Sequence, residues 1–208
     1  MGKDYELNET EKVYLTKSRK INVLHVAPTF YPATRWGGPI FSTKALCDAL
    51  ACRSDVELEV LTTDANDPES RGRMVLDSNP AKFKSGYQVR YTSRVAGASV
   101  SPELLMRLPA AVARADVVHL TATYSFPTLP VLAFARWFGT PVVWSPRGAL
   151  QATEQWFDAP KPKLKRAFER VCQFLRPSRT VLHVTAPMEA ELSRKRLAGI
   201  RTAEIPNI

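Results

Sequence analysis

Cysteine, long apolar runs and a signal-like start are scarce or missing in this chain, and each absence excludes a class of protein. Cys47, Cys52 and Cys172 are the only cysteines among 208 residues. So sparse and odd a set builds no disulfide framework, and we expect buried free thiols in a reducing compartment. The longest apolar stretch, Leu129–Phe138, contains Arg136 and is too short to span a bilayer. The first twenty residues lack the apolar region of a signal peptide, which favours a cytoplasmic location.

Two kinds of cofactor motif are also missing. His25, His119 and His183 lie in three separate predicted strands, with no cysteine or acid nearby at metal-ligand spacing. This pattern argues against a metal site, and we expect no metal. The G-x-G-x-x-G fingerprint of dinucleotide-dependent oxidoreductases does not follow the first predicted strand, so that class of enzyme is disfavoured.

Acidic residues are rare in the last quarter of the chain. Between Lys161 and Arg201 there are eleven basic residues and three acids, so this segment carries +8 of the net charge of +9. A concentrated basic patch favours an anionic partner more strongly than a diffuse surplus does. Nucleic acid is a weak candidate, because no helix-turn-helix signature, zinc spacing or aromatic RNA-binding run accompanies the charge. We expect no nucleic-acid partner.

Short apolar segments alternate with amphipathic segments along the chain. Strands are expected at 21–27, 56–63, 87–92, 116–120, 141–145, 180–185 and in the last residues. Helices are expected at about 40–53, 101–114, 128–138, 161–175 and from Pro187 onward. Residues 64–86 form a long predicted loop. The alternation predicts an α/β fold, a Rossmann-like three-layer domain over 21–208 with a mostly parallel sheet of about seven strands, after a flexible polar tail over 1–20.

The most informative stretch follows the first predicted strand. A turn-rich loop ends at Gly37-Gly38, and a helix begins directly after it. In an open α/β sheet, ligands bind outside the carboxyl ends of the strands. A glycine has no Cβ to block a ligand, and the N–H groups of a helix start favour an anion such as a phosphate. The pattern therefore indicates a phosphate-binding loop.

Seven segments, in order along the chain, together resemble the N-terminal half of a family 4 glycosyltransferase with the GT-B fold. They are HVAPTFYPATRWGGP, LCDALA, VELEVLTTD, DVVHLTATYSFPTLP, PVVWSPRGAL, HVTAPMEAEL and EIPNI. The resemblance implies two Rossmann-like domains that face each other across a cleft. The N-terminal domain binds the acceptor and the C-terminal domain binds most of the nucleotide sugar. It further implies retention of the anomeric configuration, without a metal or another cofactor.

The end of the sequence resembles the junction between the two domains of that family. Pro206-Asn207 matches a Pro-Asn-Gly stretch that leads into the donor domain, with Ile208 in place of the glycine. We therefore expect the donor domain to lie outside these 208 residues, and this chain to be inactive alone. Truncation, a frame shift and a separately encoded donor-domain polypeptide all stay open.

The resemblance also assigns candidate site residues on the donor side. Gly37 and Gly38 match the glycine loop whose backbone approaches the donor diphosphate, and Arg35 is a candidate phosphate contact. The family often has H-L-H-G after the fourth strand, where the second histidine lies near the transferred sugar. This chain has HLTA, which places Thr121 there as the candidate catalytic position. A hydroxyl can bond to a sugar but does not titrate near neutral pH.

Candidate acceptor contacts follow the fourth and fifth strands. Arg147 and Gly148 belong to the SPRG segment, and the guanidinium can hold an acidic or phosphorylated acceptor group, or simply fix its own loop. Tyr124, Ser125 and Trp156 are candidates for sugar stacking and hydrogen bonding. Glu189 matches a family glutamate in the first turn of a helix, where an acid also suits the helix dipole.

The basic helix expected at 161–175 has two interpretations. Its apolar stripe, Leu164, Phe168, Val171 and Leu175, packs against the sheet in the favoured one, which leaves a solvated basic face. In the other, residues 161–179 contact an anionic membrane surface, which suits a lipid-linked acceptor at the inner face of the membrane.

These observations predict the acceptor-binding domain of a retaining glycosyltransferase. The enzyme transfers a sugar from a nucleotide-sugar donor to a saccharide or lipid-linked acceptor. The alternative is a non-catalytic module, derived from such a domain, that binds a sugar or a partner protein.

Overall fold

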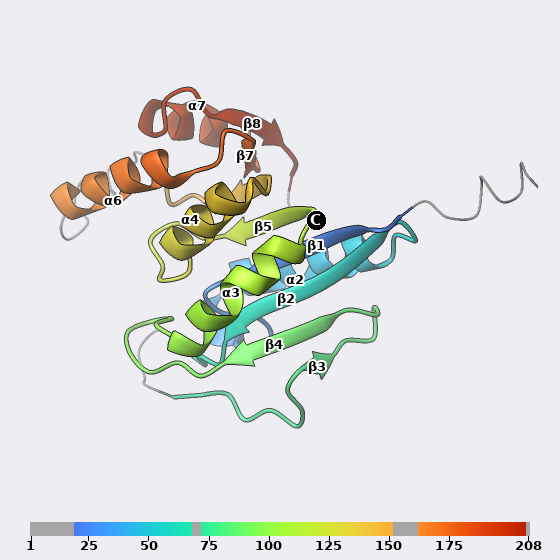
Figure 1. The fold of residues 1–208 in the computed structure, drawn as a ribbon. Coiled ribbons are helices and arrows are strands. Elements are labelled where there is room, and N and C mark those ends of the chain that lie inside the picture. Colours follow the sequence, from blue (N-terminus) through green and yellow to red (C-terminus); the bar gives the residue numbers. More distant parts are fainter. Residues whose placement is uncertain (1–18, 68–71, 152–161, 207–208) are drawn as a thin grey trace, which may run out of the picture.

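The computed structural model describes residues 19–67, 72–151 and 162–206. They form one eight-stranded sheet in the order β3-β4-β2-β1-β5-β6-β7-β8 (Figure 1). The strands are β1 (Ile21–Val26), β2 (Val56–Thr63), β3 (Ala81–Lys82), β4 (Gln88–Thr92), β5 (Val117–Thr121), β6 (Val142–Ser145), β7 (Thr180–Val184) and β8 (Arg201–Glu204). Neighbouring strands run parallel except for the antiparallel pair β3 and β4. The expected α/β fold with a mostly parallel sheet is confirmed.

Helices cover both faces of this sheet. In Figure 1, α2 (Gly38–Ala51) lies behind the sheet, and α3 (Pro102–Arg114) and α4 (Thr128–Phe138) lie in front of it. The remaining helices are α6 (Pro162–Leu175) and α7 (Pro187–Arg196), and a short 3-10 helix, η1 (Thr34–Trp36), precedes α2. The layers are therefore helix, sheet and helix, as in a Rossmann-like domain.

Local signals set the ends of two helices where the sequence predicts them. The Ser101 side chain accepts a hydrogen bond from the Leu104 N–H at 3.2 Å, which caps α3. α4 ends at Gly139, whose φ of +70° is the left-handed conformation that glycine adopts easily. The first cap marks the start of α3, and the second marks the end of α4, just before β6.

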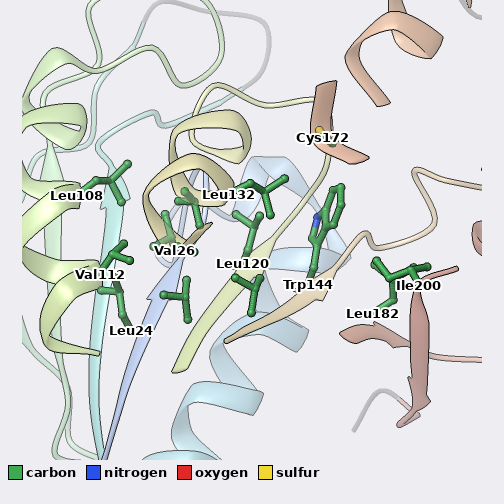
Figure 2. Packing of buried hydrophobic residues seen from close by; sticks show 14 of the residues in the cluster. Leu24, Val26, Leu108, Val112, Leu120, Leu132, Trp144, Cys172, Leu182 and Ile200 are labelled. Atoms are coloured by element: carbon green, nitrogen blue, oxygen red, sulfur yellow. The ribbon is translucent and has the colours of Figure 1, made fainter. Parts of the chain in front are cut away.

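Two buried clusters hold the layers together. The larger one joins the sheet to α3, α4, α6 and α7, and Figure 2 shows Trp144 in it beside Leu120 and Cys172. The smaller one lies on the α2 side and includes Phe30, Cys47 and Tyr91. Burial of so many apolar side chains, at roughly 1.5–3 kcal/mol for each, is the main stabilising term of such a fold.

The structure corrects three of our expectations. The loop expected over 64–86 contains the short edge strand β3, so the sheet has eight strands instead of about seven. Cys52 is exposed, whereas Cys47 and Cys172 are buried as expected. On α6, Leu164 and Val171 are 62% and 43% exposed, so only Phe168 and Leu175 of the expected stripe pack on the core. In the described part of the chain, we find no helix with the length and apolar character needed to cross a membrane.

Candidate functional site

The carboxyl ends of β1 and β5 mark the point where the connections of the sheet reverse direction. From β1 the chain passes through α2 to β2 on one side, and from β5 it passes through α4 to β6 on the other. Ligands of open α/β sheets bind outside this switch point. Since β1, β5 and β6 are parallel neighbours, the loops 27–37, 122–127 and 146–151 that follow them share one edge of the sheet. We call this edge the carboxyl edge.

Gly37 and Gly38 differ in their structural need for glycine. Gly37 has φ +82° and ends η1 by donating its N–H to the Thr34 carbonyl at 3.0 Å, a conformation that strains an L side chain. Gly38 has no positive φ, and a Cβ built on it meets nothing within 4 Å. Neither the backbone nor the packing requires glycine at Gly38. Its missing Cβ therefore leaves room for a ligand that approaches the start of α2.

The start of α2 supplies fewer free donors than a generic helix. Pro39 has no N–H, and the Ile40 N–H donates to the Gly37 carbonyl at 3.2 Å. Arg35 lies in η1, two residues before Gly37, and is exposed, and we find no hydrogen bond or ion pair between it and any described residue. An anion at this loop therefore depends on a cation as well as on the helix start.

Arg147 supplies a fixed cation at the carboxyl edge. It follows β6, has φ +54° and is partly buried. The buried Glu189 carboxylate of α7 accepts the Gly148 N–H at 2.7 Å, and the Thr185 N–H and hydroxyl at 2.8 Å each. Burial lowers the pKa of Arg147 while the charge of Glu189 acts to raise it, and an arginine stays protonated throughout. Glu189 thus positions the loop that carries the guanidinium.

A chain of hydrogen bonds lies within the sheet at the same edge. The His183 Nε2 bonds to the Ile205 carbonyl at 3.0 Å, and its Nδ1 bonds to Ser145 Oγ at 2.9 Å. Ser145 Oγ also bonds to His119 Nε2 at 2.7 Å. A carbonyl only accepts, so in neutral His183 the hydrogen is on Nε2, Ser145 donates to Nδ1, and His119 donates to Ser145. One backbone carbonyl therefore fixes the direction of the whole chain.

His25 extends this polar layer to β1. Its ring centroid is 4.6 Å from that of His119, and its Nε2 is 3.2 Å from Thr121 Oγ1. Burial, with a smaller contribution from the Arg147 charge, lowers the pKa of His25 to about 3. The pKa of His119 is also well below its usual value, chiefly through burial, and that of His183 is lowered by burial and by Arg147. All three imidazoles are neutral at physiological pH.

We predict that acid destabilises the protein through these histidines. In the unfolded chain the three histidines take up protons near pH 6.5, while in the folded protein they stay neutral. As the pH falls, protonation therefore stabilises the unfolded state, and the free energy of unfolding decreases. Stability is complete above pH 6.5 and falls by up to about 1.4 kcal/mol per pH unit for each fully buried histidine, until the pH reaches the lowered pKa of about 3 for His25. Urea unfolding at about pH 7 and pH 5.5 measures the loss. His25→Gln should reduce the slope, and an equal slope in this variant would contradict the assignment.

Thr121, the candidate catalytic position, and the candidate acceptor residues Tyr124 and Ser125 lie in two different settings. Thr121 is 5% exposed, and its hydroxyl is hydrogen-bonded to the buried His25 ring within the sheet. Tyr124 donates its hydroxyl to the Glu169 carboxylate of α6, and Ser125 Oγ lies 3.1 Å from Thr128 Oγ1. Their roles toward a sugar stay predictions. Trp156 lies outside the described residues.

A buried ion pair fixes α6 beside the site. Both nitrogens Nε and Nη2 of Arg196, in α7, donate to both Glu169 carboxylate oxygens at 2.5–3.1 Å. The two side chains are 9% and 7% exposed. Because Glu169 and Cys172 face inward, the basic residues Lys163, Arg166 and Arg170 lie on the exposed part of α6. The favoured sequence interpretation of a solvated basic face fits this arrangement, although the buried face is different from the expected one.

Sequence reasoning missed Ser145 and the convergence of the three histidines. The sequence pattern places each histidine in a separate strand and predicts no contact between them. Their positions could have predicted this convergence, because each histidine stands near the carboxyl end of a strand in a parallel sheet. In the structure, His25 and His119 are register partners. Among the described residues, no three or more His, Cys, Asp or Glu side chains form a group suited to a metal ion. The expected independence from metals stays a prediction.

Comparison with known proteins gives the family. A family model described as a glycosyl transferase 4-like domain matches residues 37–207, which include the glycine pair, Thr121 and Arg147. No curated protein is a significant match to the chain. Because the matched residues cover most of the sequence and their α/β fold is a Rossmann-like one, the chain belongs to the glycosyl transferase 4-like domain family.

Proposed function

We propose that this domain forms the acceptor-side wall of a retaining glycosyltransferase. The enzyme moves a sugar from a nucleotide-sugar donor to a saccharide or lipid-linked acceptor. The observation that carries the proposal is the position of Arg147, a partly buried cation at the carboxyl edge whose loop is bound to Glu189 through the Gly148 N–H. The same edge holds the exposed, unobstructed Gly38 at the switch point of the sheet.

The two features complement a diphosphate leaving group, so this proposal gives Arg147 a donor contact in place of the acceptor contact that the sequence resemblance implies. Negative charge accumulates on the diphosphate as its bond to the sugar breaks, and a preorganised guanidinium stabilises that charge with two parallel hydrogen bonds. Gly38 allows the phosphate oxygens to approach the backbone without meeting a side chain. We propose Thr121 and Arg35 as secondary contacts, to the sugar and to the phosphate respectively.

We further propose that transfer needs a second wall. In the described residues, the candidate donor contacts come from one edge of one sheet, whereas catalysis depends on groups that surround the transition state. The 208-residue polypeptide by itself should therefore bind a nucleoside diphosphate without turning over a nucleotide sugar. A donor domain, in the same or another polypeptide, would complete the cleft.

Gly38→Ala separates the binding role from a folding role. An alanine in the first turn of α2 should stabilise the fold by up to about 0.5–1 kcal/mol, because it removes glycine's entropy cost without a clash. It should weaken nucleoside diphosphate binding, measured by titration calorimetry, by about tenfold, since a methyl group then occupies the phosphate approach. Urea unfolding measures the gain in stability.

Ala49→Gly is the matched control. Ala49 is exposed at the other end of α2, so this change should cost about 0.5–1 kcal/mol of stability and leave the affinity unchanged. Unaltered affinity in Gly38→Ala would contradict the proposed diphosphate contact. Turnover of a nucleotide sugar by the polypeptide alone would contradict the need for a second wall.

A further inference from the structure

An apolar cavity opens beside the proposed acceptor site. It has a volume of about 500 Å³ and lies between residues 98–100, the loop after β5 with the start of α4, and the first half of α6. Its carbon-rich lining comes from Val100, Phe126, Leu129, Pro130, Leu164 and Phe168. The size is typical of small-molecule sites. The loop after β5, with the candidate acceptor residues Tyr124 and Ser125, belongs both to the carboxyl edge and to the lining of the cavity.

The polar groups of this lining already have partners within the protein. Ser99 Oγ accepts the Phe126 N–H at 3.3 Å, and Ser125 Oγ lies 3.1 Å from Thr128 Oγ1. The Tyr124 hydroxyl donates to Glu169. A sugar ring buried here would lose hydrogen bonds to water without replacing them, which is costly for each hydroxyl. The lining therefore favours a hydrocarbon.

The lining of the cavity also includes a cation. Lys165 lines it, with its Nζ 5.2 Å from the centroid of the Tyr124 ring. Glu169 is the only acid of the described α6, and its charge is paired with Arg196. An occupant that joins a hydrocarbon chain to a negatively charged head complements both parts of the surface.

We propose that this cavity holds the hydrocarbon chain of a lipid-linked acceptor, whose phosphate lies against Lys165. The inference rests on the proposed function and selects the lipid-linked class over a free saccharide. The chain lies against the apolar lining, which includes Leu129 and Leu164. The basic part of α6 then faces the anionic membrane surface from which the lipid comes.

Decyl phosphate, used below its micellar concentration, tests the cavity without any sugar transfer. It should bind the full 208-residue chain saturably at one site and shift the amide NMR signals of Val100, Phe126 and Leu129, but not that of Val75, which is 97% exposed elsewhere. Decanol and inorganic phosphate should each bind at least tenfold more weakly, because each lacks half of the interaction. Equal binding of inorganic phosphate, or shifts that miss the cavity, would overturn the proposal.

Two exposed residues of the same helix give matched variants. Leu164 lines the cavity and is 62% exposed, whereas Phe174 is 71% exposed and is not part of the lining. Leu164→Asp should weaken decyl phosphate binding about tenfold, and Phe174→Asp by less than about twofold. Equal losses would assign binding to the helix surface and overturn the cavity site. Self-association of the lipid-free chain that Leu164→Asp abolishes, seen by sedimentation, would assign the cavity to a second copy and overturn it too.

The binding assay and the transfer assay fail independently. Decyl phosphate bound in the cavity, without transfer in the presence of a donor domain, would leave the cavity assignment intact and refute the proposed function. Transfer to a saccharide without a lipid chain, by a protein that does not bind decyl phosphate, would support the proposed function and refute the cavity assignment.

Discussion

Replacing Arg147 by methionine is expected to weaken nucleoside diphosphate binding about a hundredfold. The residue is partly buried, and the Glu189 carboxylate fixes the adjacent backbone by accepting the Gly148 N–H, so the loop that carries the guanidinium needs little reorganisation to meet a phosphate. A charge-assisted hydrogen bond contributes roughly 1.5–3 kcal/mol, and about 1.4 kcal/mol corresponds to a factor of ten in affinity. Arg147→Lys keeps the charge but loses the planar fork, and should weaken binding about tenfold. Titration calorimetry measures both variants.

A second measurement tests whether Arg147 occupies the expected position. Its charge lowers the pKa values of His25 and His183, so the methionine variant should lose less stability on acidification than the parent protein. Arg176→Met is the control, because burial also lowers the pKa of Arg176, but this side chain contacts Gln173 and the Ala198 carbonyl. Equal loss of affinity in the two variants would show that the Arg147 effect is unspecific.

Breaking the Glu169–Arg196 pair should produce the largest change in stability. Glu169→Ala leaves the Arg196 guanidinium buried without its carboxylate, and removes the acceptor of the Tyr124 hydroxyl. Loss of one partner of a buried ion pair lowers the free energy of unfolding by about 3–5 kcal/mol. Urea unfolding, monitored by circular dichroism, measures this loss.

Two further variants test whether the loss of stability comes from leaving a charge buried without its partner. Glu191→Ala removes an exposed partner of Lys195 on α7 and should leave the unfolding midpoint unchanged. A Glu169→Leu, Arg196→Met double variant should recover most of the lost stability, because apolar side chains of similar size fill the space without a desolvation penalty. A double variant as unstable as Glu169→Ala would argue that the geometry of the pair, rather than its charge, holds α6.

The strands and most helix ends could be predicted from the sequence because their signals are local. The Ser101 cap and Gly139 depend on residues within one turn of the helix end. β3 escaped prediction because it has two residues, and the Asn79 side chain supplies the neighbouring contacts, accepting the Tyr91 N–H and donating to the Tyr91 carbonyl. No periodicity is readable over so short a strand.

The errors at α6 and in the site have a common cause, namely contacts between distant residues. Glu169 is charged, so the apolar pattern assigns it to the surface, yet a partner 27 residues away buries it. Glu189 was expected at a helix start, but its contact with Gly148 spans 41 residues. His119, Ser145 and His183 meet because their strands are neighbours in the sheet, and strand order is not encoded in local spacing.

The neutral histidine layer has a consequence for enzyme kinetics. The sequence contains three histidines, and all three belong to this layer. Burial lowers the pKa of all three below its ordinary value, that of His119 well below it and that of His25 to about 3, so His25 and His119 do not change charge near pH 6. An inflection near pH 6 in a pH–rate profile would then point away from His25 and His119, and toward His183, a substrate such as a phosphate monoester whose second ionisation lies near 6, or a residue from another domain. Kinetic titration of the assembled enzyme thus becomes a probe of what it has bound.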